Sequence, residues 1–353
     1  MTATAEGIDG RRLATIEQIA EIAPIPDADA IVRARVRGWD VVVKKGELAP
    51  GDLCVYFEVD SLLDVTDERF AFLAPRGVRT DVEGNSGHVL RTARLRGQYS
   101  QGLALPVAEF PELGPVDEAR VGEDVTARLA VRKWEAPIPA ELAGTARGMR
   151  PSWIPATDEE RVQNIAAILT AEADWIATEK IDGTSTTFWV GPGDQGVCSR
   201  NLDLLESAAN RLWQLAGELD VHERLRASGL GERVALQGET FGEGIQGNPL
   251  KIRGSRFAAF TLRADGVEVP RGSWPEWVAE LSVPVNDELT FPGSVDEALE
   301  QVEKLRSKVS PGRPVEGIVW RAADRAQVTT ADGQVLRASF KVISNRYLLK
   351  HDR

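Results

Sequence analysis

A lysine followed by an aspartate and a glycine, at Lys180, Asp182 and Gly183, is the first group in this sequence that could do chemistry. It lies between two apolar-leaning runs, 173–177 and 186–190, so we expect a strand, a tight turn and a second strand, with Gly183 giving the turn its backbone freedom. A lysine held at such a turn is a nucleophile if its pKa falls from the usual value of about 10.4. Motifs this short also occur by chance in surface hairpins, so the interpretation depends on the rest of the chain.

Charged side chains recur at the ends of other expected strands. Arg200 ends one strand, Glu239 and Glu316 each adjoin a glycine, and Lys341 lies inside the last strand. A site for a nucleotide and a divalent metal needs such carboxylates and cations near closely approaching backbone. Taken singly, each charge is more often turned to water, and Phe260 in its apolar strand is more often core. The combination is what indicates a site.

Composition indicates a globular protein that is long enough for two domains, with 353 residues, 42% hydrophobic and 27% charged. No apolar run is long enough to span a bilayer and residues 1–6 lack a signal peptide's features, so we expect a cytoplasmic protein with no membrane partner and no evident protein partner. Cys54 and Cys198 are expected to be buried free thiols, and three histidines without Cys/His spacing argue against a zinc site. The net charge of −12 argues against unspecific coating of nucleic acid but leaves room for a local basic groove.

The amino-terminal region reads as short strands broken by turns. Strands are expected over 31–36, 39–43 and 53–57, which favours a small barrel. A brief helix is predicted over 16–22. Near residue 94, Arg94 and Arg96 would share one face of a strand, beside an aromatic residue that could stack on a base. A solvated edge strand protected by arginines explains the same pattern equally well.

An irregular stretch carrying Arg147 and Arg150 separates this region from the second half. A helix is then predicted to begin after Thr157, with Glu160 completing a capping box. The domain prediction is therefore an amino-terminal β-barrel domain over 1–130, a linker over 131–156 and a second domain over 157–353.

In order and spacing, the segments of the second half resemble the nucleotidyltransferase motifs of the covalent ligase and capping-enzyme superfamily. The matching segments are Glu179 to Gly183 (motif I), Ser199 to Asn201 (motif Ia), Gly238-Glu239 (motif III), Phe260, Glu316 to Val319 (motif IV) and Phe340-Lys341 (motif V). Within the superfamily the chain is most similar to nick-sealing RNA ligases of the Deinococcus type, on segments 38–47, 56–61, 96–102 and 160–164. The resemblance implies an α+β fold: an OB-like barrel, then an adenylation domain of antiparallel sheets with flanking helices.

The resemblance also implies a chemistry and its residues. Lys180 would attack ATP and carry AMP, Lys341 would neutralise the α-phosphate, and Glu316 would orient a divalent cation, Mg²⁺ or Mn²⁺, or its waters. A neutral Lys180 requires a lowered pKa, for which the cation and Lys341 would be responsible. The nucleotide would further contact Glu179, Ile181, Asp182, Gly183, Arg200, Glu239 and Phe260. A nicked or broken RNA or RNA/DNA duplex would be held by Arg94, Arg96, Arg147, Arg150, Arg161 and Asn164.

Three alternatives remain open: a DNA ligase, a guanylyltransferase using GTP, and a nucleic-acid-binding protein without catalysis. A barrel before the catalytic domain and a chain that ends soon after motif V favour RNA ligase. One departure concerns motif V, where many relatives carry two lysines one residue apart. Here Ser339 and Ile343 flank Lys341 at those distances, and Arg337 would substitute only if the strand bends.

Overall fold

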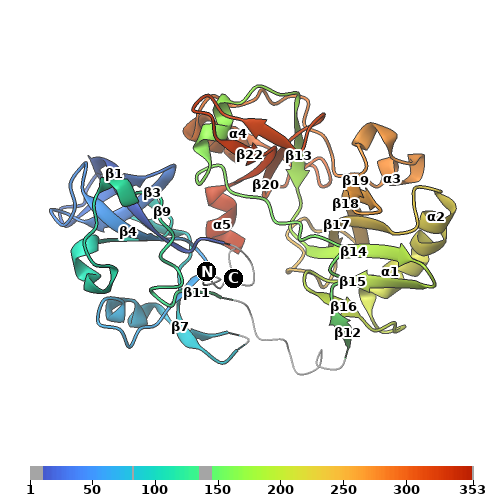
Figure 1. The fold of residues 1–353 in the computed structure, drawn as a ribbon, viewed down its shortest axis with the longest axis horizontal. Coiled ribbons are helices and arrows are strands. Elements are labelled where there is room, and N and C mark those ends of the chain that lie inside the picture. Colours follow the sequence, from blue (N-terminus) through green and yellow to red (C-terminus); the bar gives the residue numbers. More distant parts are fainter. Residues whose placement is uncertain (1–10, 82, 135–144, 352–353) are drawn as a thin grey trace, which may run out of the picture. The chain divides into compact units, whose positions relative to one another are not determined.

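The computed structural model describes residues 11–81, 83–134 and 145–351 (Figure 1). It divides into two compact units, 1–138 with 348–353, and 139–347. The central part of the predicted linker, 135–144, lies outside the described residues.

The first unit is built on a five-stranded antiparallel sheet with the order β10-β4-β1-β2-β3. A second sheet has the order β11-β5-β7-β6, and β8 and β9 form a hairpin. The strands are β1 Ala14–Pro24, β2 Ile31–Val36, β3 Trp39–Lys44, β4 Leu53–Phe57, β5 Ser61–Leu63, β6 Arg79–Thr80, β7 Ser86–Val89, β8 Ala93–Leu95, β9 Gln98–Ser100, β10 Leu103–Pro106 and β11 Arg132–Lys133. Short 3-10 helices are η1 Ala71–Arg76, η2 Val107–Glu109, η3 Pro111–Leu113 and η4 Glu118–Arg120.

The helix predicted over 16–22 is wrong, because these residues belong to β1. Strand β1 pairs with β4 along its first half and with β2 along its second, so its backbone groups are satisfied by neighbours rather than within a helix. Ile16 packs into the core on one face of the sheet and Ile19 into the core on the other. Because β1 buries apolar side chains on both faces, its sequence lacks the strict alternation of apolar and polar residues that indicates a half-buried strand.

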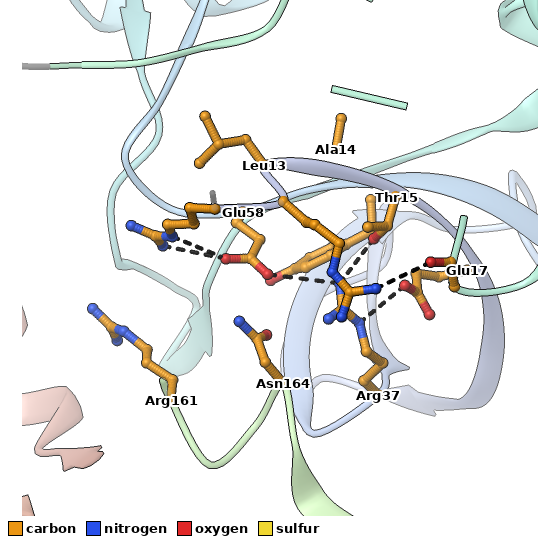
Figure 2. A network of polar contacts seen from close by, with 12 residues as sticks. Leu13, Ala14, Thr15, Glu17, Arg37, Glu58, Arg161 and Asn164 are labelled. Carbon is orange, nitrogen blue, oxygen red and sulfur yellow. Dashed lines mark hydrogen bonds and ion pairs between the residues drawn. The ribbon is translucent and has the colours of Figure 1, made fainter. Parts of the chain in front are cut away.

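A buried ionic network lies beside β1 in the first unit (Figure 2). The Arg37 guanidinium is 3.0 Å from a carboxylate oxygen of Glu17 and 3.7 Å from one of Glu58, and it donates a hydrogen bond to the Thr15 hydroxyl at 2.8 Å. Both carboxylates are almost fully buried, Glu17 at 4% and Glu58 at 1% exposure. Arg37 therefore compensates the buried Glu17 carboxylate and shares the buried Glu58 carboxylate with Arg11, whose guanidinium lies 3.2 Å from it.

The second unit contains a seven-stranded antiparallel sheet, β12-β16-β15-β14-β17-β18-β19, a three-stranded sheet, β13-β20-β23, and a β21–β22 hairpin. The strands are β12 Ala146–Met149, β13 Trp175–Lys180, β14 Thr184–Gly191, β15 Asp194–Cys198, β16 Leu202–Leu204, β17 Val234–Gly242, β18 Ser255–Ala264, β19 Val267–Glu268, β20 Gly317–Ala322, β21 Gln327–Thr329, β22 Val335–Arg337 and β23 Ser339–Ile343. The helices are α1 Arg211–Glu218, α2 Val221–Ala227, α3 Glu276–Glu280, α4 Val295–Lys304 and α5 Asn345–His351, with 3-10 helices η6 Ala166–Thr170 and η7 Arg271–Ser273.

Each sheet of this unit has its own core. Helices α1, α2 and α3 contribute apolar residues to the core of the larger sheet, while α4 packs on the smaller one (Figure 1). The acidic helix predicted over 294–308 is present as α4, in which Ser294 is the N-cap and Val295, Ala298 and Val302 form the buried stripe. The amphipathic helix predicted from residue 204 begins only at Arg211, because Asn210 caps it.

The two strands predicted on either side of Lys180 and Gly183 are present, but they do not pair with each other. Strand β13 pairs with β20 in the smaller sheet, whereas β14 pairs with β15 and β17 in the larger one. Residues 181–183 are therefore a connection between two sheets. Periodicity identifies strands but not their partners, so the sequence pattern could not distinguish a crossing from a hairpin.

The helix predicted after Thr157 is also wrong. Residues 157–164, which we call the edge segment, run extended into a turn and bond to the backbone of β23. The Lys341 N–H donates to Glu160 O at 2.8 Å and the Val162 N–H donates to Lys341 O at 3.0 Å. The Glu160 carboxylate, predicted to complete a capping box, accepts a hydrogen bond from the Asn164 side chain instead. Pairing with an open sheet edge has overridden the local capping signal.

The remaining predictions on composition concern membranes and thiols. In the described ranges no helix is both long and apolar enough to span a membrane. Cys54 and Cys198 are buried free thiols, as predicted, and burial raises the pKa of the Cys54 thiol to about 12.

Candidate active site

Lys180 forms an ion pair with Glu316, and the sheet register explains why. Lys180 ends β13 directly opposite Gly317, the first residue of β20, so the preceding Glu316 lies beside the lysine. The Lys180 ammonium donates to Glu316 Oε2 at 2.9 Å and lies 2.8 Å from Oε1. Two residues that are 136 positions apart in the chain therefore form the centre of the site.

The carboxylates around Lys180 act against the lowered pKa that a nucleophilic lysine needs. Burial acts to lower the pKa of the Lys180 ammonium, but Glu316, Glu239 and Asp182 outweigh burial, so the pKa is raised. Without a nucleotide, Lys180 is therefore protonated at neutral pH. The cation and Lys341 invoked to lower this pKa would have to overcome three carboxylates before the amine could attack.

Gly183 is required for close approach rather than for an unusual backbone angle. A Cβ at this position would lie 2.3 Å from Thr240 O and 2.9 Å from Glu239 Cγ, and the φ of Gly183 is not positive. The absence of a side chain thus lets the connection 181–183 lie directly against β17. This contact places Asp182 and Glu239 close to Lys180.

We expect Gly183→Ala to reduce both stability and the chemistry of Lys180. The added methyl group must displace a backbone oxygen, an overpacking that typically costs about 1–3 kcal/mol. Thermal unfolding and the rate of covalent nucleotide transfer to Lys180 measure the two effects. Gly148→Ala is the matched control, because a Cβ there meets no atom within 4 Å. Equal behaviour of the two variants would contradict the close-approach explanation.

A cleft of about 560 Å³ lies between residues of the two sheets of the second unit. Nine of the predicted nucleotide-site residues line it: Glu179, Lys180, Ile181, Asp182, Gly183, Arg200, Glu239, Phe260 and Lys341. Phe260 from β18 and Val319 from β20 line it from different sheets, an arrangement that suits a flat base between them. Glu316 is not a lining residue and reaches the cleft through its ion pair with Lys180.

Two of these residues contribute less of their side chains than we expected. The Glu179 carboxylate accepts a hydrogen bond from the Lys308 N–H at 2.8 Å, so it anchors the loop 307–310, and burial raises its pKa. Ile181 is 3% exposed and packs into a small apolar core that also contacts Phe260. Their side chains therefore support the cleft wall.

The edge segment supplies site residues that sequence reasoning missed. Asp158 forms an ion pair with Arg200 at 2.7 Å, and the Glu159 carboxylate accepts hydrogen bonds from the Ser339 hydroxyl and the Arg321 guanidinium. Asp158, Glu159 and Arg321 all line the cleft. The acidic run 158–160 was the available signal, but we interpreted it as a helix start.

The structure also bears on the departure in motif V. Ser339 is buried and bound to Glu159, and Arg337 belongs to the separate strand β22, where its guanidinium bonds to Asp158 O and Glu159. Arg337 does not line the nucleotide cleft. In the edge segment, Arg161 forms a parallel backbone bridge with Lys341 of β23.

The residues predicted to hold nucleic acid come from both units. Arg96 occupies the turn between β8 and β9 with a φ of 48°, so it does not share a strand face with Arg94, which lies 5.5 Å from the Tyr99 ring. The Arg147 guanidinium is bound to Asp203 at 2.7 Å and Asp194 at 3.0 Å, and Arg150 donates to Pro155 O. None of the six residues Arg94, Arg96, Arg147, Arg150, Arg161 and Asn164 lines the cleft.

The donor set around Lys180 fits a hard divalent cation held largely through water. Glu316, Glu239 and Asp182 supply oxygen atoms, which Mg²⁺ and Mn²⁺ prefer. Within 11–81, 83–134 and 145–351, no group of three or more Asp, Glu, His or Cys side chains is arranged to hold a metal directly. Mg²⁺ commonly keeps several waters and binds one or two carboxylates plus substrate phosphates, so the set is sufficient.

We expect Glu239 to make stability fall as pH rises. Burial raises its pKa from 4.5 to about 8, with Lys180 opposing and Glu316 and Asp182 reinforcing the effect. A raised carboxyl pKa means that the folded state binds the proton more tightly, so this contribution is complete below pH 4.5 and is lost as pH approaches 8. The melting temperature should fall more between pH 5.5 and 8.5 (about three units) in wild type than in Glu239→Gln. Parallel curves for the two proteins would contradict this.

Models of two known protein families match two stretches of the chain. An OB-fold domain model matches residues 13–107, and an RNA ligase model matches residues 173–343, which include the cleft's β13, β17 and β23. No curated protein matches the chain. The OB-fold match and the two antiparallel sheets with flanking helices confirm the predicted α+β fold class.

Solved structures of an RNA ligase from Naegleria gruberi are similar over nearly the whole chain. A mutant with AMP and manganese is 38% identical, with a TM-score of 0.83 over 97% of this chain and 99% of that chain. The same ligase with pyrophosphate is 38% identical, with a TM-score of 0.82 over 97% and 100%. A mutant with ATP and manganese gives the same values. At this identity and coverage, the chain belongs to the RNA ligase family.

Proposed function

We propose that the protein is an ATP-dependent RNA ligase that joins a 3′-hydroxyl to a 5′-phosphate in RNA or RNA-containing duplexes. The observation that carries the proposal is the Lys180–Glu316 pair in a cleft that also contains Lys341, Glu239 and Phe260. The relatives from Naegleria gruberi were solved with ATP, AMP, pyrophosphate and manganese, which supports ATP and a divalent cation as ligands here.

In the first step, the Lys180 amine attacks the α-phosphorus of ATP, forms a phosphoramide bond to AMP and releases pyrophosphate. Lys180 must first lose the proton that the Glu316 carboxylate holds on it. A divalent cation bound near Glu316 would supply positive charge to the α-phosphate and favour the neutral amine. Lys341, opposite Val319 in the sheet, adds a fixed positive charge to the same side of the cleft.

The other cleft residues bind and orient the nucleotide. Phe260 and Val319 hold the base between the two sheets, and Glu239 accepts hydrogen bonds from the ribose hydroxyls. Arg200 reaches the ribose only by exchanging its Asp158 partner for the ligand. AMP then passes to the 5′-phosphate of the broken strand, and the 3′-hydroxyl displaces it to close the phosphodiester.

The proposal also names a nucleic-acid substrate and the residues that would contact it. We place a nicked RNA or RNA/DNA duplex as substrate, with Arg94 and Arg96 of the first unit and Arg147, Arg150, Arg161 and Asn164 of the second as candidate contacts. Because Arg147 is already paired with two carboxylates, it is the one we expect to contribute least. The two buried free thiols support a reducing, cytoplasmic location.

A sealing assay tests this function. Matched nicked duplexes would carry either ribonucleotides or deoxyribonucleotides at the 3′-hydroxyl side, with a 5′-hydroxyl duplex as negative control. We expect ATP- and metal-dependent sealing of the ribonucleotide nick and none of the control. Sealing of the all-DNA nick alone, or labelling of the protein by GTP and not ATP, would favour the alternative enzymes.

A further inference from the structure

Asp182 lies in the connection between the two sheets, where no strand pairing fixes it. Residues 181–183 are outside every strand, so the ladders that hold Lys180 and Glu239 do not hold the side chain of Asp182. Yet Asp182 lines the cleft and is one of the carboxylates whose charge acts on both Lys180 and Glu239. Its orientation therefore needs another source.

One such source is a tyrosine that follows motif V. The Tyr347 hydroxyl donates a hydrogen bond to Asp182 Oδ2 at 2.9 Å, across 165 positions of sequence. The Tyr347 ring is 5% exposed, so it has little freedom to move away from the carboxylate. A hydrogen bond to a carboxylate from a donor held in this way is stronger and more directional than a neutral one.

The segment that carries Tyr347 is itself anchored at the site. The Ser344 N–H donates to Glu316 O at 2.9 Å, which ties the end of β23 to the residue that pairs with Lys180. The Ser344 hydroxyl accepts from the Tyr347 N–H at 3.0 Å and donates to Glu303. The Glu303 carboxylate also accepts the Arg346 N–H at 3.0 Å, so α4 holds the first turn of α5. The tyrosine thus reaches Asp182 from a fixed base.

We propose that Tyr347 is a positioning residue for nucleotide transfer to Lys180, acting by holding the Asp182 carboxylate in place beside the lysine. This rests on the proposed function. A carboxylate free to turn would carry its negative charge toward the reacting α-phosphate, where it would oppose the negative charge that develops as the lysine attacks and pyrophosphate leaves. Tyr347 acts through Asp182 and does not touch the reacting atoms, so its loss slows the transfer step more than it weakens nucleotide binding.

Tyr347→Phe removes the hydroxyl and keeps the buried ring. We expect the maximal single-turnover rate of Lys180 adenylation to fall about tenfold, the scale of one hydrogen bond to a charged group. The ATP concentration for half-maximal rate should stay within about twofold of wild type, because the base and ribose contacts remain. Tyr56→Phe is the matched control: Tyr56 is fully buried in the first unit, where its hydroxyl donates to Gln101 O at 3.0 Å. That variant should adenylate at the wild-type rate.

A double-mutant cycle shows whether the effect passes through Asp182. In the Asp182→Ala background, which has no acceptor for the tyrosine hydroxyl, and with long incubations, the further change Tyr347→Phe should cost nothing. An equal loss in both backgrounds, an unchanged rate in Tyr347→Phe, or a loss confined to ATP affinity would each overturn the proposal. If wild type itself forms no lysyl-AMP, the proposed function fails first. If wild type is labelled and Tyr347→Phe is labelled equally fast, the role of Tyr347 alone is refuted.

Discussion

The Lys180→Arg protein is expected to form no detectable covalent adduct with AMP while it folds as wild type does. Arginine keeps the positive charge that Glu316 binds at 2.8 Å, so the ion pair at the centre of the site survives. A guanidinium remains protonated at any pH where the protein is folded, so it offers no lone pair to the α-phosphorus. We expect the adenylation rate to fall by about 10⁴-fold or more, as when other enzymes lose a nucleophile.

The measurement is a time course of label transfer from α-labelled ATP, with thermal unfolding measured on the same samples. Lys304→Arg is the matched control, because Lys304 makes an exposed pair with Glu300 far from the cleft lining. It should behave as wild type in both measurements. Label transfer to Lys180→Arg at more than a small fraction of the wild-type rate would show that another residue carries the nucleotide.

The second large effect concerns stability of the first unit. We expect Arg37→Met to destabilise it by about 3–5 kcal/mol, because breaking a buried ion pair leaves uncompensated charge. Arg37 lies 3.0 Å from the buried Glu17 carboxylate, and Glu58 also pairs with Arg11, so Glu17 is the carboxylate that loses most when methionine fills similar space without charge (Figure 2). Denaturant unfolding followed by a probe in the first unit measures the change.

The control for this prediction is Arg132→Met in the same unit. Arg132 pairs with Glu83 at 2.8 Å, but both side chains are more than half exposed. An exposed pair contributes about 0–1 kcal/mol, so the control should unfold near wild type. Equal losses of unfolding free energy in the two variants would show that the buried network contributes no more to stability than an exposed ion pair.

Sequence reasoning found the chemistry of the site more readily than its local structure. The residue types that motifs I, III and V require are unusual at strand ends, so Lys180, Glu239 and Lys341 could be identified, and the fold brings them to one cleft. Their roles in catalysis stay predictions. The raised pKa of Lys180 in the absence of a cation and a nucleotide has no signal in the sequence, because it depends on how close three carboxylates lie in space.

The errors have a common cause in long-range pairing. Strand β1 lacks the alternation of a half-buried strand because it buries both faces, and the edge segment carries a local capping pattern that predicts a helix. In both cases pairing with other strands decided the structure: β4 and β2 pair with β1, and β23 pairs with the edge segment. Tyr347, 165 positions from its partner Asp182, had no sequence signal at all.

The central claim is that Lys180 becomes covalently joined to AMP. The most direct measurement incubates the folded protein, shown by mass to carry no nucleotide, with α-labelled ATP and manganese, and then resolves it on a denaturing gel. We predict a labelled band that maps to the peptide containing Lys180 and is discharged by pyrophosphate. No band, or a label on a different residue, would contradict the account.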